Sequence, residues 1–184
     1  RDIRIRIKGV KNTRQITRAM QMVATSKMKK AQESAKAGRP YALLLADVIV
    51  SIADEFEEVT QSYFAQRPVK HRGILVIGTD KGLCGALNSN LFRELGDVDS
   101  SAKFVSVGKR ATQYLSRARK DLLADFSLPD KPTFSDIRNI VEFLLNSYEE
   151  GRIDTIEVLY TSFINTLRQE PELIRLFPLN DLDA

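Results

Sequence analysis

The first 36 residues carry a pattern of hydrophobic positions that is typical of one long helix. Apolar side chains recur at steps of three and four residues within successive groups: Ile3, Ile7 and Val10, then Ile16, Met20 and Val23, and more loosely Met28 and Ala31. This spacing places them in a narrow stripe along one side of a helix. The predicted helix is about 54 Å long at 1.5 Å per residue, and no later segment predicts a helix of matching length. Because a narrow stripe usually contacts another helix, we expect a partner from outside this chain.

A second helical segment is predicted from Tyr41 to about Glu58. Its apolar residues extend almost all the way around, which indicates burial on more than one side. Between the two segments lies the sequence GRPY, residues 38–41, in which Pro40 removes a helical hydrogen bond. We therefore expect the long helix to be kinked or interrupted near Pro40. We assign residues 1–59 to the long helical segment and residues 60–72 to a polar linker.

Residues 73–184 show a different pattern, in which short apolar runs alternate with helical segments. Strands are predicted at residues 73–80, 103–108 and 153–163, with a fourth possible at 172–179. Helices are predicted at residues 83–95 and 109–119, and a third begins after Ser135, which we expect to cap it without a capping box. This alternation predicts a Rossmann-like α/β domain with a mainly parallel sheet.

Charge is unevenly distributed along the chain. Residues 1–36 contain eleven Lys or Arg and two acidic residues, for a net charge of +9. The rest contains seventeen basic and twenty-two acidic residues, for a net charge of −5, and the sum is the overall +4. A basic arm on a mildly acidic body predicts an anionic partner for the arm.

Several classes of protein are disfavoured by composition. The single cysteine, Cys84, excludes an internal disulfide, and the single histidine, His71, lies in a charged segment without a neighbouring cluster of metal ligands. We therefore expect no metal site. No apolar run approaches the roughly 18 residues that a transmembrane helix needs.

A glycine-rich turn, GTDKGLCGALNSNLF at residues 78–92, follows the first predicted strand and invites a nucleotide-binding interpretation. Its glycines, Gly78, Gly82 and Gly85, do not match G-x-G-x-x-G, and no Lys-Ser/Thr pair follows the last glycine. We favour a tight turn that lets strand and helix pack closely. Asp80 and Lys81 are candidate catalytic residues, although no His, Ser or second carboxylate accompanies them.

The basic arm has two competing interpretations. Lys and Arg give sequence-independent affinity for phosphates, which is typical of a nucleic-acid-binding protein. However, residues 1–36 contain no aromatic side chain for base stacking, and their Met and Ala residues suit contact with a protein surface. We therefore favour a protein partner and keep nucleic acid as the alternative.

Four segments resemble one known family in the family's own order: NTRQITRAMQMVATSKM (residues 12–28), GRPY (38–41), GTDKGLCGALNSNLF (78–92) and FINTLRQEPELIRLFPL (163–179). Together they resemble the gamma subunit of the F-type rotary ATP synthase. Lys81 stands where that family usually has Arg, and Ala86 where it usually has Gly. The family's sequences continue further and end in a long C-terminal helix that pairs antiparallel with the first, and this sequence lacks that helix.

The resemblance implies a rotor shaft that couples rotation to ATP synthesis or hydrolysis in other subunits and performs no bond chemistry itself. The implied partners are the alpha and beta subunits of the catalytic ring, the epsilon subunit and the membrane rotor ring, without nucleic acid, cofactor or small-molecule ligand. The implied location is a peripheral complex on the cytoplasmic face of a bacterial membrane, or the matrix or stromal face in an organelle. The implied contacts with the ring are Ile16, Met20, Val23, Lys27 and Lys30.

Overall fold

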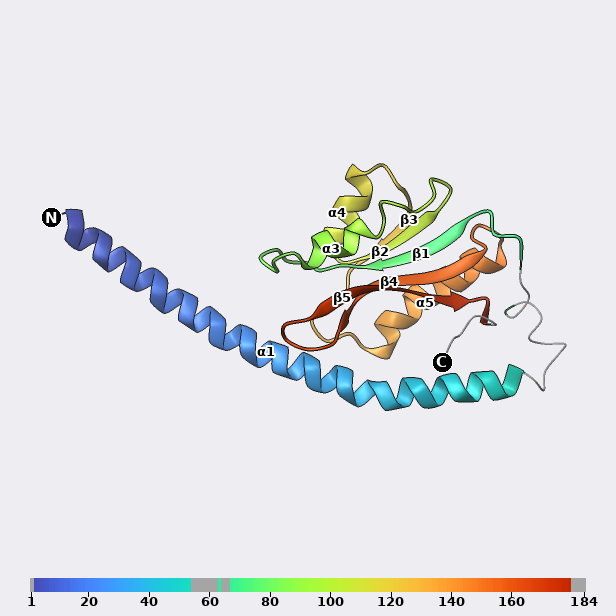
Figure 1. Cartoon of the computed structure of the whole chain (residues 1–184), viewed down its shortest axis with the longest axis horizontal. Coiled ribbons are helices and arrows are strands. Elements are labelled where there is room, and N and C mark those ends of the chain that lie inside the picture. The colour runs from blue at the N-terminus through green and yellow to red at the C-terminus, as the bar shows by residue number, and fades with distance from the viewer. Residues whose placement is uncertain (1, 54–62, 64–66, 180–184) are drawn as a thin grey trace. The chain divides into compact units, whose positions relative to one another are not determined.

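The structure is a computed structural model that describes residues 2–53, 63 and 67–179. By its internal contacts the chain divides into two compact units, residues 1–55 and residues 56–183. The first unit contains one long helix, and the second contains a five-stranded sheet with its covering helices (Figure 1). The predicted helix end near Glu58 and the predicted start of the linker at residue 60 lie outside the described residues.

Helix α1 spans Asp2–Ala53 and contains Pro40 in its interior. Of the two outcomes expected near Pro40, a kink or an interruption, the interruption is therefore wrong, and Figure 1 shows one continuous ribbon that bends along its length. An interior proline costs about 3 kcal/mol because one hydrogen bond is lost and the ring crowds the preceding turn. Residues 36–40 are all exposed, so water can hydrate the carbonyl group that loses its partner. At 1.5 Å per residue, the 52 residues of α1 extend about 78 Å.

The sheet has the order β3-β2-β1-β4-β5. Its strands are β1 Arg72–Ile77, β2 Lys103–Val107, β3 Asp121–Phe126, β4 Thr155–Phe163 and β5 Gln169–Phe177. The first four are parallel, and β5 pairs with β4 in antiparallel orientation. The predicted α/β fold with a mainly parallel sheet is confirmed, although the sequence did not predict β3.

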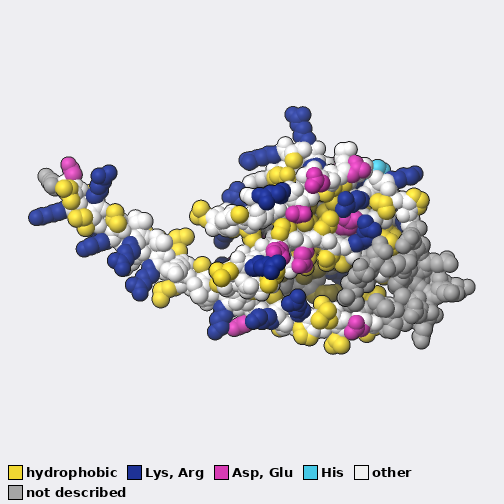
Figure 2. All heavy atoms as spheres, in the orientation of Figure 1, with side chains coloured by type: hydrophobic (Ala, Val, Ile, Leu, Met, Phe, Trp, Pro, Cys, Tyr) yellow, Lys and Arg dark blue, Asp and Glu magenta, His cyan; other side chains and the backbone are white. Residues whose placement is uncertain are grey.

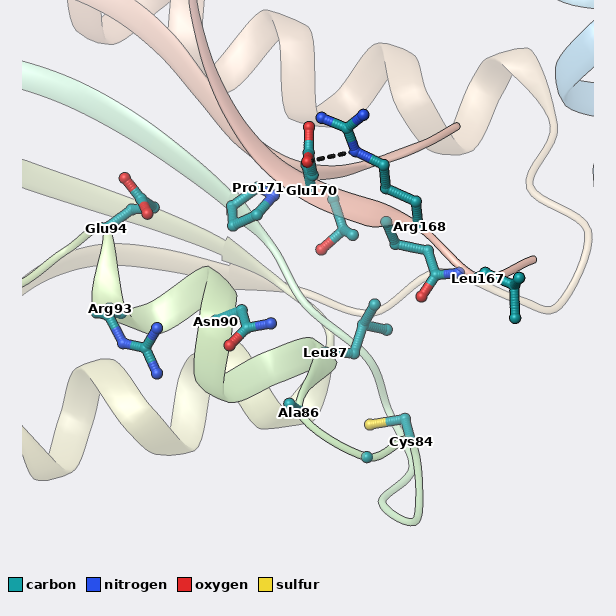
Figure 3. A pocket seen from close by; sticks show the side chains of 13 residues that line it. Cys84, Ala86, Leu87, Asn90, Arg93, Glu94, Leu167, Arg168, Glu170 and Pro171 are labelled. Carbon is teal, nitrogen blue, oxygen red and sulfur yellow. Dashed lines mark hydrogen bonds and ion pairs between the residues drawn. The ribbon is translucent and has the colours of Figure 1, made fainter. Parts of the chain in front are cut away.

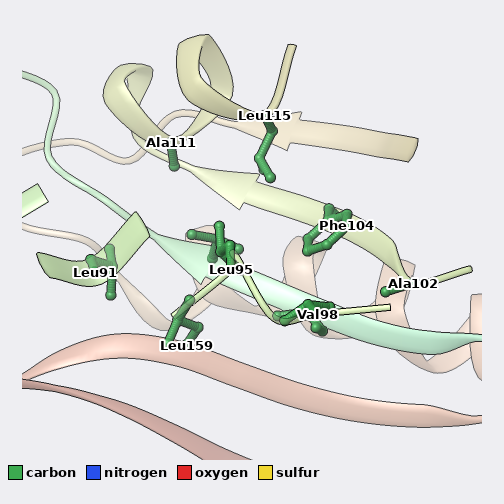
Figure 4. Packing of buried hydrophobic residues seen from close by; sticks show 10 residues of the cluster. Leu91, Leu95, Val98, Ala102, Phe104, Ala111, Leu115 and Leu159 are labelled. Carbon is green, nitrogen blue, oxygen red and sulfur yellow. The ribbon is translucent and has the colours of Figure 1, made fainter. Parts of the chain in front are cut away.

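Helices cover both faces of the sheet (Figure 1). Helices α3 (Leu87–Arg93) and α4 (Lys109–Arg117) share a buried cluster with one face, and α5 (Phe134–Glu149) shares a second cluster with the other. Alternate strand residues contribute to the two clusters, since Ile74 and Phe104 belong to the first and Leu75 and Val105 to the second. Figure 4 shows Leu115 and Phe104 toward one end of the first cluster and Leu91 at the other, with Leu95 between them.

Two predicted helix starts are corrected by the structure. Helix α3 begins at Leu87 rather than near Leu83, because Leu83 and Gly85 adopt left-handed backbone angles, φ 62° and 61°, that a helix cannot contain. Helix α5 begins after Thr133 rather than Ser135. Thr133 and Asp136 form a capping box, in which the Asp136 carboxylate accepts hydrogen bonds from the backbone N–H and the hydroxyl of Thr133.

A buried carboxylate joins three strands of the sheet. Glu157 on β4 is only 2% exposed and accepts hydrogen bonds from Arg72 on β1, Arg175 on β5 and the Thr155 hydroxyl. The two arginine side chains keep 29% and 39% of their surface exposed. The buried negative charge is therefore balanced by two cations that still reach water.

Candidate interaction surface on helix α1

The five predicted contact residues lie on one face of α1. Ile16, Met20, Val23, Lys27 and Lys30 follow each other at intervals of four, three, four and three residues within one continuous helix, which brings them to the same side. Ile16, Met20 and Val23 are 61%, 61% and 59% exposed. Apolar side chains this exposed, in a row along one helix, are typical of a protein contact surface.

Three threonine side chains on α1 use their hydroxyl groups within the helix itself. The hydroxyls of Thr13, Thr17 and Thr25 donate hydrogen bonds to the backbone carbonyls four residues earlier, at 3.0, 2.8 and 2.8 Å. Each hydroxyl is thus used within the helix. The sequence analysis did not single out these threonines. The available signal was that Thr13 lies four residues after Gly9 and Thr17 four residues after Thr13.

Basic side chains accompany the apolar face. Figure 2 shows Lys and Arg side chains spread along the arm on the face in view, with hydrophobic side chains between them. Lys27 and Lys30 are exposed, and the adjacent Lys29 forms an exposed ion pair with Glu33 at 4.0 Å. With eleven basic and two acidic residues in positions 1–36, the arm suits a partner surface that carries carboxylates.

A pocket of about 640 Å³ lies in the sheet unit, beside the carboxyl ends of β1 and β4. Figure 3 shows Cys84 and Asn90 on one side and Leu167 and Glu170 of the β4–β5 hairpin on the other. In open α/β sheets this position is where ligands commonly bind. Among the described residues, however, no group of three or more His, Cys, Asp or Glu side chains could hold a metal ion.

The candidate catalytic residues Asp80 and Lys81 do not line this pocket. The Asp80 carboxylate instead accepts a hydrogen bond of 3.1 Å from the backbone N–H of Lys109, at the start of α4. A carboxylate thus occupies a position at a helix N-terminus that suits a phosphate group. The structure supports the packing interpretation of the glycine turn, since a Cβ at Gly78 would lie 3.0 Å from the Cβ of Ala111.

Comparison with known proteins gives the class of the chain. The model of the family described as ATP synthase matches residues 1–184. The ATP synthase gamma chain of Opitutus terrae is 50% identical over 179 residues, which cover 97% of this chain and 61% of the relative. The gamma chain of Methylacidiphilum infernorum is 42% identical over 189 residues, which cover the whole of this chain and 64% of the relative. The chain belongs to the ATP synthase gamma-chain family.

Solved structures agree with this assignment. The central stalk and c-ring structure of the Tetrahymena thermophila mitochondrial ATP synthase contains a chain that is similar with a TM-score of 0.69 and 25% identity, covering 89% of this chain and 72% of that one. A chain of the Euglena gracilis mitochondrial ATP synthase rotor shares the fold, with a TM-score of 0.51 and 18% identity. The present chain spans somewhat less than two thirds of the length of the two gamma chains above.

Proposed function

We propose that this chain forms part of the central stalk, or rotor shaft, of a proton-translocating F-type ATP synthase. In this role it couples rotation of the membrane rotor to ATP synthesis or hydrolysis in the ring of alpha and beta subunits. The observation that carries the proposal is the exposed apolar face on the 52-residue helix α1, in a chain of the gamma family. The similarity to a central-stalk chain of Tetrahymena thermophila supports it.

The partners in this proposal are the alpha and beta subunits, the epsilon subunit and the membrane rotor ring. The chain acts without a catalytic group of its own, since the nucleotide chemistry takes place in the ring. No helix among residues 2–53, 63 and 67–179 has the length and apolarity to span a bilayer. We place the chain in a peripheral part of a membrane complex, on the cytoplasmic face of a bacterial membrane or on the matrix or stromal face in an organelle.

The mechanism is a shift in the populations of conformations at the catalytic sites. A single shaft inside a ring of three chemically identical sites presents a different face to each site. Each site therefore has a different affinity for nucleotide at any moment, because the shaft contacts stabilise its conformations unequally. Rotation moves these contacts from site to site, so that every site passes through binding, reaction and release.

The five contact residues divide into two chemical kinds. Ile16, Met20 and Val23 are exposed apolar side chains that meet the inner surface of the ring without directional bonds. Lys27 and Lys30 meet carboxylates of the beta subunits. The apolar residues allow the surfaces to move past each other, and the lysines favour particular angular positions of the shaft.

Assembly tests the proposal directly. Residues 1–184 are joined to the remaining part of the Opitutus terrae gamma chain, and this chimera is expressed with the other subunits of that ATP synthase. We expect one copy of the chimera to co-elute with each ring and the complex to hydrolyse ATP. If the ring forms without the chimera, the proposal is wrong.

Substitution on the contact face tests the residue assignment. Met20→Lys adds a charge to the apolar face and should lower the number of protons pumped per ATP hydrolysed, because the new ionic contact resists rotation at one position. Met22→Lys is the matched control. Met22 is 70% exposed, but its position two residues further along the helix turns it to another side of α1. Equal ratios in the two variants would contradict the assignment.

A further inference from the structure

Five side chains fasten the segment before β1 to the sheet unit, and we call this group the clamp: Tyr63, Arg67, Tyr148, Glu149 and Phe177. Tyr63 donates a hydrogen bond from its hydroxyl to the Glu149 carboxylate at the end of α5. Its ring meets that of Phe177 edge to face, with ring centroids 5.7 Å apart and an interplanar angle of 78°. This arrangement combines a charge-assisted hydrogen bond with a favourable aromatic contact.

Arg67 makes the second half of the clamp. Its guanidinium group lies 4.4 Å from the centroid of the Tyr148 ring and donates a hydrogen bond of 3.2 Å to the Tyr148 carbonyl. Tyr148 is fully buried, and its ring also lies 5.8 Å from that of Phe177. Tyr63 and Arg67 are therefore attached to the same aromatic pair, in which Tyr148 belongs to the core between α5 and the sheet and the partly buried Phe177 packs against it.

Further contacts continue from the clamp to the start of β1. The backbone N–H groups of Lys70 and His71 each donate a hydrogen bond of 2.8 Å to Asp154. Arg72, the first residue of β1, then pairs with the buried Glu157. The chain between Tyr63 and Arg72 is thus held at five positions within ten residues.

We propose that the clamp is the anchor at which force passes between the sheet unit and α1, so that its residues act as positioning residues for rotary coupling. The inference rests on the proposed function of the chain as a rotor shaft. The backbone between Ala53 and Arg72 is one covalent route for force between the two units. The clamp attaches this backbone to the core at Tyr63, about halfway along it.

Loss of the clamp should weaken coupling because an unattached stretch of backbone extends before it transmits force. An unattached chain can extend by about 3.4 Å per residue before it transmits force. Among the described residues between Ala53 and Arg72, loss of the clamp contacts leaves Lys70 as the next attached position, so that a longer stretch of backbone can yield when the shaft turns against a load. Part of each rotation is then absorbed as displacement. When the load is small the slack matters little, so the loss appears only against a gradient.

The side chains of the clamp suit a permanent attachment at neutral pH. The hydrogen bond to the Glu149 carboxylate, together with partial burial, raises the pKa of the Tyr63 hydroxyl above its ordinary value, so the hydroxyl stays protonated and remains a donor. Tyr63 therefore keeps its hydrogen bond to Glu149 at neutral pH.

The test uses the chimeric gamma chain assembled in the Opitutus terrae ATP synthase, in inverted membrane vesicles. The variants are Tyr63→Phe, which removes only the hydroxyl, Arg67→Met and Glu149→Leu. Glu149→Gln keeps an oxygen that accepts the Tyr63 hydrogen bond, and Arg138→Met is a matched control in an exposed ion pair on the same helix. Two quantities are measured: ATP hydrolysis with an uncoupler, and the largest pH gradient that ATP hydrolysis sustains.

We expect the first three variants to lose part of the sustained pH gradient while hydrolysis with the uncoupler stays at the parent rate. Glu149→Gln and Arg138→Met should sustain the parent gradient. An unchanged gradient in all variants overturns the inference, and so does an equal loss in Arg138→Met, because a general loss of stability then explains it. Failure of the parent chimera to assemble instead refutes the proposed function.

Discussion

Replacement of Glu157 by Ala should destabilise the sheet unit far more than replacement of an exposed glutamate. Glu157 is 2% exposed and accepts hydrogen bonds from two arginines and a threonine. Removal of one partner from a buried ion pair costs about 3–5 kcal/mol when the remaining charge stays away from water. Here Arg72 and Arg175 are 29% and 39% exposed, so water can hydrate both guanidinium groups after the substitution.

The expected loss therefore lies below that range and above the value of about 0–1 kcal/mol that is typical of surface ion pairs. We expect Glu157→Ala to lower the free energy of unfolding by about 2–3 kcal/mol. Glu142→Ala is the matched control, because Glu142 pairs with Arg138 and both side chains are at least 60% exposed. Its expected loss is below about 0.5 kcal/mol.

Urea denaturation followed by tyrosine fluorescence measures both values. The chain has no tryptophan, and the fully buried Tyr148 lies in the core of the sheet unit, so the signal reports on this unit. Arg72→Ala and the double variant complete a thermodynamic cycle, which should give a coupling energy of at least about 1 kcal/mol. Equal losses for Glu157→Ala and Glu142→Ala would refute the reasoning.

Three further predictions concern backbone geometry, helix capping and pH. Gly108→Ala should lower the free energy of unfolding, measured by urea denaturation, by at least about 2 kcal/mol, because φ is 92° and the new Cβ would lie 2.4 Å from a backbone oxygen. Gly151→Ala should lower it by about 1 kcal/mol, because φ is 70° but the space around the residue is open. Thr133→Ala should cost about 1 kcal/mol through loss of the α5 cap, and an unchanged midpoint would contradict this. Burial favours the neutral form of Asp154, but two backbone N–H hydrogen bonds outweigh it and hold the pKa of the carboxyl below the ordinary 3.8. The parent chain should therefore have a higher free energy of unfolding than Asp154→Asn, with the full difference above about pH 5. This difference should disappear as the pH falls through the lowered pKa, and a constant difference between pH 7 and pH 2 would disprove the reasoning.

Strands in the centre of the sheet were predictable, and the edge strand β3 was not. Strands β1 and β2 are buried runs rich in Val and Ile, which almost any arrangement would place in a core. Strand β3, with the sequence DLLADF, has no β-branched residue and carries two aspartates. Its extended conformation comes from pairing with β2, which is a tertiary effect that no local pattern contains.

At Pro40 the helix continues rather than ends, because the rest of α1 outweighs one lost hydrogen bond. The helical spacing of Ile16, Met20 and Val23 predicts that they share one side of a helix, and α1 places them there, whereas their contact with a ring follows from the family resemblance and stays a prediction. The clamp was not. Tyr63 and Arg67 appeared as part of a polar linker, and their partners lie more than 80 residues away in sequence. The two adjacent aromatic residues Tyr63 and Phe64 in a mostly polar linker were the signal available there.

The internal hydrogen bonds of Thr13, Thr17 and Thr25 have a consequence for friction. A hydroxyl that bonds to its own helix does not need a partner on an opposing surface. In the proposed shaft, a surface that slides past these positions meets hydroxyls whose protons are already used within the helix. These three positions then add little to the variation of the contact energy with angle. Thr→Val at these positions should leave the speed of an unloaded shaft unchanged.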